Sequence, residues 1–243
     1  FTGLQPDTLK NLAKVIPDAS RDETRYIITG VCFDKTTEWN KKKGYLVTTN
    51  GRQLTVAEAG AGADCLPFEG VLPRKCAEIL ASLGPGGFVS GQAGLLDSER
   101  ETGYFEISKS WGKISVASRL LNGTYPRWET TIPSGRPEST GFWDCAKLLP
   151  ELEALEKITD KLVGEISPEG CKLQSETSEA SCTNPPIKHI RGESRKTCNI
   201  KFLQRACQLF PRGAEINSHD PGPYTATENG ATHVFMPMRR LKS

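Results

Sequence analysis

The sequence predicts an α+β protein of two domains, each built from repeated units of one helix followed by several strands. Three observations support this fold class. Apolar residues recur with helical spacing in four segments, 5–16, 73–83, 142–155 and 199–210. Short runs rich in β-branched and aromatic residues follow each of these segments. A linker with two prolines and a glycine, residues 132–137, separates the two halves.

The first half is predicted to run helix, three strands, helix, three strands. Pro6 suits the first turn of the helix at 5–16, and Pro73 opens the second helix. The pair Asn50-Gly51 is a strong signal for a tight hairpin between two of the strands. The expected strands cover residues 24–33, 45–49, 54–57, 88–91, 103–108 and 113–119.

The second half is predicted to repeat this plan. Pro150 interrupts the helix at 142–155, so a kink or a short first piece is expected there. Residues 178–186 are polar and are predicted to be weakly structured. The expected strands cover residues 161–166, 171–177, 187–191, 214–216, 223–226 and 232–238. The repeat predicts helices on one face of antiparallel sheets, in domains spanning residues 1–133 and 134–243.

The composition is typical of a soluble globular protein, with 37% hydrophobic and 25% charged residues among 243. No apolar run approaches the roughly 18 residues that a membrane-spanning helix needs, so we expect no membrane partner. The net charge of +2 is too small for binding to nucleic acid through the overall field. Nucleic-acid binding through one basic face remains compatible with that charge.

The sequence offers little for catalysis or metal binding. Its eight cysteines show no metal-ligand spacing, and free intracellular thiols are favoured over a disulfide framework in a chain of this length. His189, His219 and His233 have no nucleophile or carboxylate at motif spacing, and no phosphate-binding glycine loop occurs. We therefore expect a protein without catalytic activity, metal or cofactor.

The C-terminal stretch from Val234 to Arg239 contains both methionines of the chain, Met236 and Met238, on either side of Pro237. A strand that carries proline is an edge strand or is ending, because proline cannot donate to the sheet. Methionine side chains adapt to irregular surfaces and also fill gaps in a core. The stretch is therefore either part of a binding pocket or the end of a core strand.

Four local motifs occur in order along the chain, and Pro73-Arg74-Lys75 opens the second helix between them. The motifs are Asp22-Glu23-Thr24-Arg25-Tyr26 with Gly30-Val31-Cys32-Phe33, then Thr48-Thr49-Asn50-Gly51-Arg52-Gln53-Leu54, Asn122-Gly123-Thr124-Tyr125-Pro126 and Met236-Pro237-Met238-Arg239. Together they resemble the bacterial DNA sliding clamp, the β subunit of DNA polymerase III. The resemblance runs over nearly the whole chain and matches the middle and C-terminal domains of that family, so its first domain has no counterpart here.

The resemblance implies the DNA clamp fold and the function of a processivity factor, which makes and breaks no bond. Such a clamp encircles duplex DNA and holds DNA polymerase and clamp-loader-type proteins near it through short linear motifs. It implies a cytoplasmic, nucleoid-associated protein and a homo-oligomeric ring, a trimer if two domains are the whole subunit. The alternative is a truncated clamp that binds peptides without encircling DNA.

The resemblance also assigns site residues. Contacts to the DNA backbone without sequence preference are implied for basic and aromatic residues, although each could equally be a solvated side chain. These are Lys10, Lys14, Arg25, Tyr26, Arg74, Lys75, Lys147, Lys201 and Arg205. A partner-peptide groove is implied for Ile28, Thr49, Gly51, Arg52, Gln53, Leu54, Pro126, Thr131, Asn199, Phe202, Met236, Pro237, Met238 and Arg239.

Three departures from the family bear on partner choice. Arg52-Gln53 stands where the family commonly has His-Arg, so one planar charge beside the groove is lost. The chain continues through residues 240–243, whereas the family usually ends with one leucine after the arginine. The loop that aligns with the border of the groove, residues 220–223, is unusually rich in proline. We therefore expect partner specificity to differ more than the fold.

Overall fold

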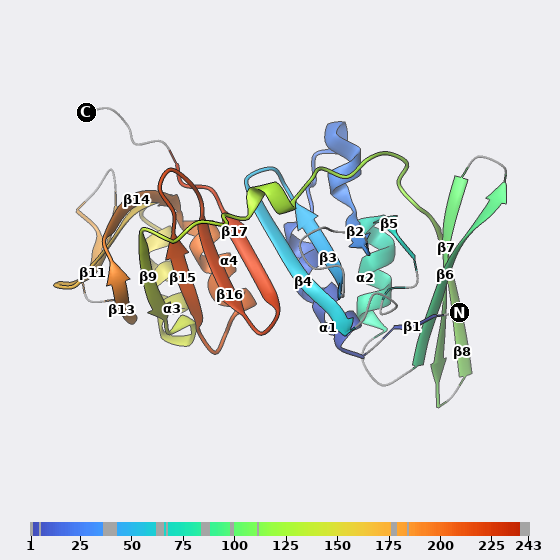
Figure 1. Ribbon diagram of the computed structural model, residues 1–243. Coiled ribbons are helices and arrows are strands. Elements are labelled where there is room, and N and C mark those ends of the chain that lie inside the picture. The colour runs from blue at the N-terminus through green and yellow to red at the C-terminus, as the bar shows by residue number, and fades with distance from the viewer. Residues whose placement is uncertain are drawn as a thin grey trace. The chain divides into compact units, whose positions relative to one another are not determined.

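The computed structural model describes residues 2–4, 6–35, 43–61, 66, 68–83, 88–97, 100–110, 112–175, 179–183 and 185–238. The chain divides into two compact units, Phe1–Thr130 (unit 1) and Thr131–Ser243 (unit 2), which are coloured blue to green and green to red (Figure 1). The predicted boundary after residue 133 lies in the same linker. The assignment of the units to the middle and C-terminal domains of the family stays a prediction.

Unit 1 combines helices α1 and α2, which pack against each other, with antiparallel strands. Its elements are β1 (Thr2–Leu4), α1 (Pro6–Val15), η1 (Ile16–Asp18), η2 (Glu23–Thr29), β2 (Val31–Asp34), β3 (Lys43–Thr49), β4 (Gln53–Ala61), β5 (Gly70–Leu72), α2 (Arg74–Ser82), β6 (Phe88–Asp97), β7 (Arg100–Lys109), β8 (Gly112–Arg119) and η4 (Glu129–Thr131). One sheet has the order β1-β6-β7-β8. A second set of strands pairs in the order β5-β2-β3-β4.

Unit 2 follows the same plan, with helices α3 and α4 packed together. Its elements are β9 (Ser139–Trp143), α3 (Cys145–Glu156), β10 (Lys161–Ser167), β11 (Gly170–Ser175), β12 (Ser181–Thr183), β13 (Ile187–Gly192), β14 (Ser194–Asn199), α4 (Ile200–Leu209), β15 (Ala214–Ser218), β16 (Tyr224–Glu228) and β17 (Ala231–Phe235). One sheet has the order β14-β10-β11-β12. The other strands pair in the order β13-β9-β15-β16-β17.

The strand pairings reveal the internal repeat directly. In each unit the first strand pairs with the strand after the second helix, as β1 does with β6 and β9 with β15. The strand before the second helix pairs with the first strand after the first helix, as β5 does with β2 and β14 with β10. Strand β13 is an addition to this plan in unit 2. The predicted α+β class, with repeated helix-plus-strand units and antiparallel sheets, is confirmed (Figure 1).

Helix α1 shows why the repeated helices form where the sequence predicts them. Pro6 is its first residue, where a missing N–H costs no hydrogen bond. Leu9, Leu12 and Val15 are at most 2% exposed and face the sheet, on which α1 packs over β3 and β4. Each such side chain contributes about 1.5–3 kcal/mol on burial. Helix formation here therefore depends on packing of one face.

The expected strand over residues 24–33 is wrong in its first part. Residues Glu23–Thr29 form the 3-10 helix η2, and only Val31–Asp34 is a strand. The Asp22 side chain caps this segment by accepting from the backbone N–H of Thr24 at 3.0 Å. A local side-chain cap thus competes successfully with strand pairing, which the β-branched composition alone favoured.

The expected helix over 142–155 begins later than predicted and is not broken. Phe142 and Trp143 belong to β9, and Asp144 caps the helix by accepting from the backbone N–H of Lys147 at 3.4 Å. α3 then runs unbroken through Pro150. Leu148, Leu152 and Leu155 anchor it in the core, and this packing outweighs the cost of the proline.

Three other expectations change in unit 2. The polar segment 178–186 contains strand β12, and β14 (Ser194–Asn199) has no counterpart among the predicted strands. The closing strand ends at Phe235 instead of Met238, because Pro237 cannot donate to a sheet. The described cysteines are all free thiols, and none of the described helices is long and apolar enough to cross a membrane.

Candidate functional site

The Asn50-Gly51 turn includes or adjoins four of the predicted groove residues in unit 1, Thr49, Gly51, Arg52 and Gln53. The Asn50 side chain accepts from the backbone N–H groups of Arg52 and Gln53, both at 2.9 Å. Gly51 has φ of 85°, a conformation that favours glycine. The Thr49 hydroxyl donates to the Gln53 carbonyl at 2.6 Å and accepts from the Gly51 N–H at 3.0 Å. The turn is therefore a rigid exposed feature, with Arg52 pointing into solvent.

Arg25, predicted to face DNA, lies against this same turn. A Cβ atom added to Gly51 would stand 2.6 Å from Nη2 of Arg25 and 2.7 Å from its Nη1. The guanidinium therefore packs on the glycine backbone, in space that any other residue at position 51 would occupy. One side chain of the predicted DNA set thus touches the predicted partner-binding turn.

A second turn of unit 1 carries Pro126 and contacts the same short helix η2. The Tyr26 hydroxyl donates to the carbonyl of Asn122, while 53% of the Tyr26 surface stays exposed. Pro126 is exposed and Thr131 lies exposed at the end of η4. Helix η2 therefore touches both turns that the resemblance assigns to the groove, through Arg25 and Tyr26.

The predicted apolar groove residues of unit 1 differ in accessibility from its turn residues. Ile28 is 2% exposed and Leu54 is 3% exposed, so both are core residues of the chain as folded. Gln53 is half-buried, and its Oε1 atom has no hydrogen-bond partner. An unpaired buried acceptor of this kind is costly.

In unit 2 the predicted residues converge on strand β14. Asn199 ends this strand and caps α4, because its side chain accepts from the Lys201 N–H at 2.9 Å. Phe202 follows, half-buried, in the first turn of α4. The backbone N–H of Met238 donates to the carbonyl of Thr197 at 2.8 Å. The sequence missed β14, and with it the reason why these two segments meet.

The Met-Pro-Met segment leaves the sheet at the end of β17. Met236 is 44% exposed, and Pro237 and Met238 are half-buried. The long apolar side chain of Met236 is therefore accessible to solvent at the end of the strand. The predicted groove residue Arg239 and the extension over 240–243 lie outside the described residues.

The predicted DNA-facing residues lie on all four helices, but they are not equally available. Lys10, Lys75 and Lys201 are exposed on α1, α2 and α4. Arg74 is only 22% exposed and is held by Glu78 at 2.8 Å and by the Ala19 carbonyl at 3.2 Å. The remaining helix residues are Lys14, Lys147 and Arg205, of which Lys147 is exposed and pairs with Asp144 at 2.8 Å. Exposed ion pairs of this kind contribute little and open easily.

A further group of contacts surrounds Lys196, which sequence reasoning did not single out. Its side chain is 13% exposed, and its ammonium donates to the backbone carbonyl of His219. Glu138 Oε2 lies 3.4 Å from the ammonium. A lysine within a polar strand carries no sequence signal for burial, so only the structure reveals this contact to the loop between β15 and β16.

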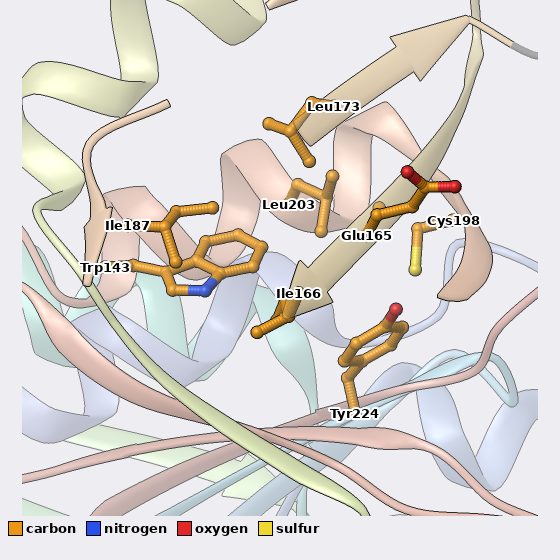
Figure 2. Close-up of a pocket in the computed structure, with 9 residues that line it drawn as sticks. Trp143, Glu165, Ile166, Leu173, Ile187, Cys198, Leu203 and Tyr224 are labelled. Atoms are coloured by element: carbon orange, nitrogen blue, oxygen red, sulfur yellow. The ribbon is translucent and has the colours of Figure 1, made fainter. Parts of the chain in front are cut away.

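An apolar cavity lies within unit 2 (Figure 2). Its empty volume is about 300 Å³, including open solvent at its mouth, and its walls include Trp143, Leu173, Leu203 and Tyr224. The buried indole N–H of Trp143 has no hydrogen-bond partner. The lining is nearly devoid of polar surface, so we interpret this cavity as an imperfectly packed part of the core.

Two cysteines and two histidines of unit 2 are held in structural contacts. Burial raises the pKa of the Cys182 and Cys198 thiols to about 12, so both stay protonated and unreactive near neutral pH. His189 contacts the Gly192 carbonyl at 2.8 Å, and His219 contacts the Thr225 hydroxyl at 3.4 Å. Among the described residues no group of three metal-ligating side chains gathers.

The chain is similar to bacterial β sliding clamps in sequence and in fold. No family model matches the chain. It is 25% identical over 246 residues to the β sliding clamp of Caulobacter vibrioides strain NA1000 / CB15N, covering 90% of this chain. The chain spans 60% of the length of that curated relative.

Solved structures share the fold over nearly the whole chain. The β subunit of DNA polymerase III from Borrelia burgdorferi, in complex with a natural product, matches with a TM-score of 0.81 and 21% identity. The match covers 98% of this chain and 64% of that one. The sliding clamp of Bartonella birtlesii, bound to griselimycin, matches with a TM-score of 0.80 and 20% identity, covering 98% and 66%. The chain therefore has the sliding-clamp fold, and its predicted resemblance to the bacterial β clamp is confirmed.

Proposed function

We propose that this chain acts as a DNA sliding clamp, a non-catalytic processivity factor that holds DNA polymerase and other partners on duplex DNA. The observation that carries the proposal is the likeness to β sliding clamps, 25% identical in sequence over 90% of the chain. Since the chain spans 60% of that relative, the activity and partners of the whole relative enter here as proposals. The same proposal places the protein in the cytoplasm, with the nucleoid.

We infer candidate residues for binding a short linear motif in each unit. Unit 1 has the Asn50-Gly51 turn and the half-buried Gln53, and unit 2 has Met236 and Met238, of which Met238 is bonded to β14. Exposed apolar side chains and unpaired polar groups suit a peptide, whose side chains fill pockets while its backbone fixes register. Binding of about 8 kcal/mol, a micromolar dissociation constant, suffices for a tether that must exchange partners.

Calorimetry with griselimycin and with a polymerase-type clamp-binding peptide tests this site. We expect both probes to bind, and Met236→Ala to weaken binding about tenfold because it removes an exposed anchor. Ile158→Ala is the matched control, since Ile158 is a 62% exposed apolar residue of unit 2 outside the proposed site. Absence of heat with both probes would reject the peptide-binding proposal.

The proposed DNA contact uses the basic residues of α1 to α4. Lys and Arg on successive helices neutralise phosphates without reading bases, which permits sliding. A homo-oligomeric ring around DNA is part of the proposal, and three copies would supply six clamp domains if these two domains are the whole subunit. The alternative is a clamp fragment that binds peptides without encircling DNA.

Solution mass and retention on DNA separate these alternatives. Light scattering should give a ring-sized oligomer, and the protein should stay on circular duplex DNA and leave it once the DNA is linearised. A monomer that binds the peptide probes but is not retained on circular DNA would support the non-encircling alternative.

A further inference from the structure

The side chain of Lys196 links the two sheets of unit 2. It extends from β14, which belongs to the sheet β14-β10-β11-β12, toward the loop between β15 and β16. Its ammonium donates to the His219 carbonyl, lies 3.4 Å from Glu138 Oε2 and stands 6.0 Å from the centre of the Tyr224 ring. With the side chain 13% exposed, these groups replace most of the water that would surround a free ammonium.

The loop that receives this contact is closed at its base. The last register pair of the hairpin is Ser218 with Tyr224, and the His219 N–H donates to the Pro223 carbonyl at 3.2 Å. Glu138 adds two bonds to the same base, because its N–H donates to the Ser218 carbonyl at 2.8 Å and its carboxylate accepts from the Ser218 hydroxyl at 3.4 Å. The pair Lys196 and Glu138 therefore holds the loop from both sides.

The neighbour of Lys196 on β14 holds a second segment. Thr197, the next residue, accepts the backbone N–H of Met238 through its carbonyl at 2.8 Å. Two adjacent residues of one strand thus fix the loop at residues 219–223 and the Met-Pro-Met segment. A shift of Lys196 would change the position of the loop relative to Met238.

We propose that Lys196 is a positioning residue that fixes the loop 219–223 relative to β14, the strand to which Met238 is also bonded, and so shapes the unit 2 part of the partner-binding surface. This inference rests on the proposed function, since it assigns the loop to the same peptide site. A buried ammonium without partners is expensive, so its need for the His219 carbonyl keeps the loop in one conformation. A preorganised loop reduces the ordering cost of binding, which favours partners that fit it as it stands.

The test compares Lys196→Met with the matched control Lys188→Met in the full chain. Methionine keeps the length of the side chain and removes the ammonium, and Lys188 is an exposed lysine on β13 of the same unit. Hydrogen exchange at the His219 amide should accelerate about tenfold or more in Lys196→Met, while amides of β10 and α4 keep their wild-type rates. Griselimycin and the polymerase-type peptide should bind about fivefold more weakly, because the loop must be ordered on binding. Lys188→Met should change neither quantity.

A second variant separates positioning from a general loss of stability. Lys196→Gln keeps an N–H donor for the His219 carbonyl without the charge, and we expect its loop exchange and its affinity for the probes to lie between those of wild type and Lys196→Met. If Lys196→Met fails to fold, the comparison of Lys196→Gln with wild type carries the test: faster loop exchange with weaker binding supports the proposal.

The outcomes distinguish this inference from the proposed function. If wild type binds the probes and the Lys196 variants bind equally well, or their loop exchange is unchanged, the positioning role is wrong and the peptide site stands. If wild type binds neither probe, the proposed function fails, and the inference about the partner surface fails with it.

Discussion

At the scale of single residues, several positions in this chain depart from ideal packing. The cavity of unit 2 borders Gly164, and the Trp143 indole N–H is left without a partner. Lys196 and Gln53 are polar side chains placed where water is scarce. Such positions respond to single-atom changes, because buried volume and buried polar groups each alter the free energy of unfolding by about 1–3 kcal/mol.

Gly164→Ala is expected to stabilise the protein by about 0.5–1 kcal/mol, through added apolar burial and a less flexible unfolded chain. A Cβ at this position would lie 3.6 Å from Leu173 Cδ2 and 3.8 Å from the Tyr224 hydroxyl, which are ordinary contacts. Urea unfolding measures the change. Gly192→Ala is the contrasting control, because its Cβ would lie 1.9 Å from the Glu138 carbonyl at φ of 67° and should destabilise. A loss of stability in Gly164→Ala would show that the cavity is already filled or cannot accept a methyl group.

His219 provides a prediction for the pH dependence of stability. Burial, and then the nearby Lys196 charge, lower its pKa below the usual value of 6.5. The folded state therefore binds the proton less well than the unfolded state, so stability should fall as the pH drops below about 6.5. Thermal unfolding of wild type and His219→Gln at about pH 7.5 and about pH 5.5 measures this loss of stability. The variant should show a smaller decrease, and parallel curves for both proteins would contradict the assignment.

At the scale of elements, β14 and α4 organise the proposed partner-binding part of unit 2. The strand ends at Asn199, whose side chain caps the helix, and the preceding residues hold the loop at 219–223 and Met238. The polar sequence from Ser194 to Asn199 gives no strong strand signal, yet it pairs with β10 over six residues. Tertiary pairing thus overrides a weak local preference.

The cap at Asn199 can be tested by paired substitutions. Asn199→Ala removes the acceptor for the Lys201 N–H and should cost about 1 kcal/mol of stability. Asn199→Asp retains an acceptor and adds a negative charge at the helix N-terminus, so it should preserve the wild-type stability. Equal losses in both variants, measured by urea unfolding, would indicate that Asn199 acts through contacts other than the cap.

At the scale of the whole molecule, one plan of helix and strands serves both units, and basic residues recur on every helix. Lys10, Lys75 and Lys201 are exposed on three different helices. If these helices together face DNA, their charges act on phosphates and must show in the salt dependence of binding.

The combined variant Lys10→Glu, Lys75→Glu, Lys201→Glu should therefore bind circular duplex DNA more weakly. The slope of log affinity against log salt is negative, and we expect its magnitude to decrease by about 0.9 for each phosphate that the variant no longer neutralises. A control variant reverses Lys113, Lys172 and Lys188, which lie on strands, and should keep the wild-type slope. Equal effects in both variants would reject a DNA role for the helix face.

Local sequence determined the repeated helices, most strands and the resemblance that led to the proposed function. The apolar spacing of Leu9, Leu12, Ala13 and Ile16 predicted α1, and Asn50-Gly51 predicted a turn, because these signals depend only on near neighbours. The tertiary structure decided the rest. It formed β14 from a polar segment and buried Lys196 against the His219 loop. The strand and the buried lysine depend on partners far away in the chain, whose contacts leave no mark on the local sequence.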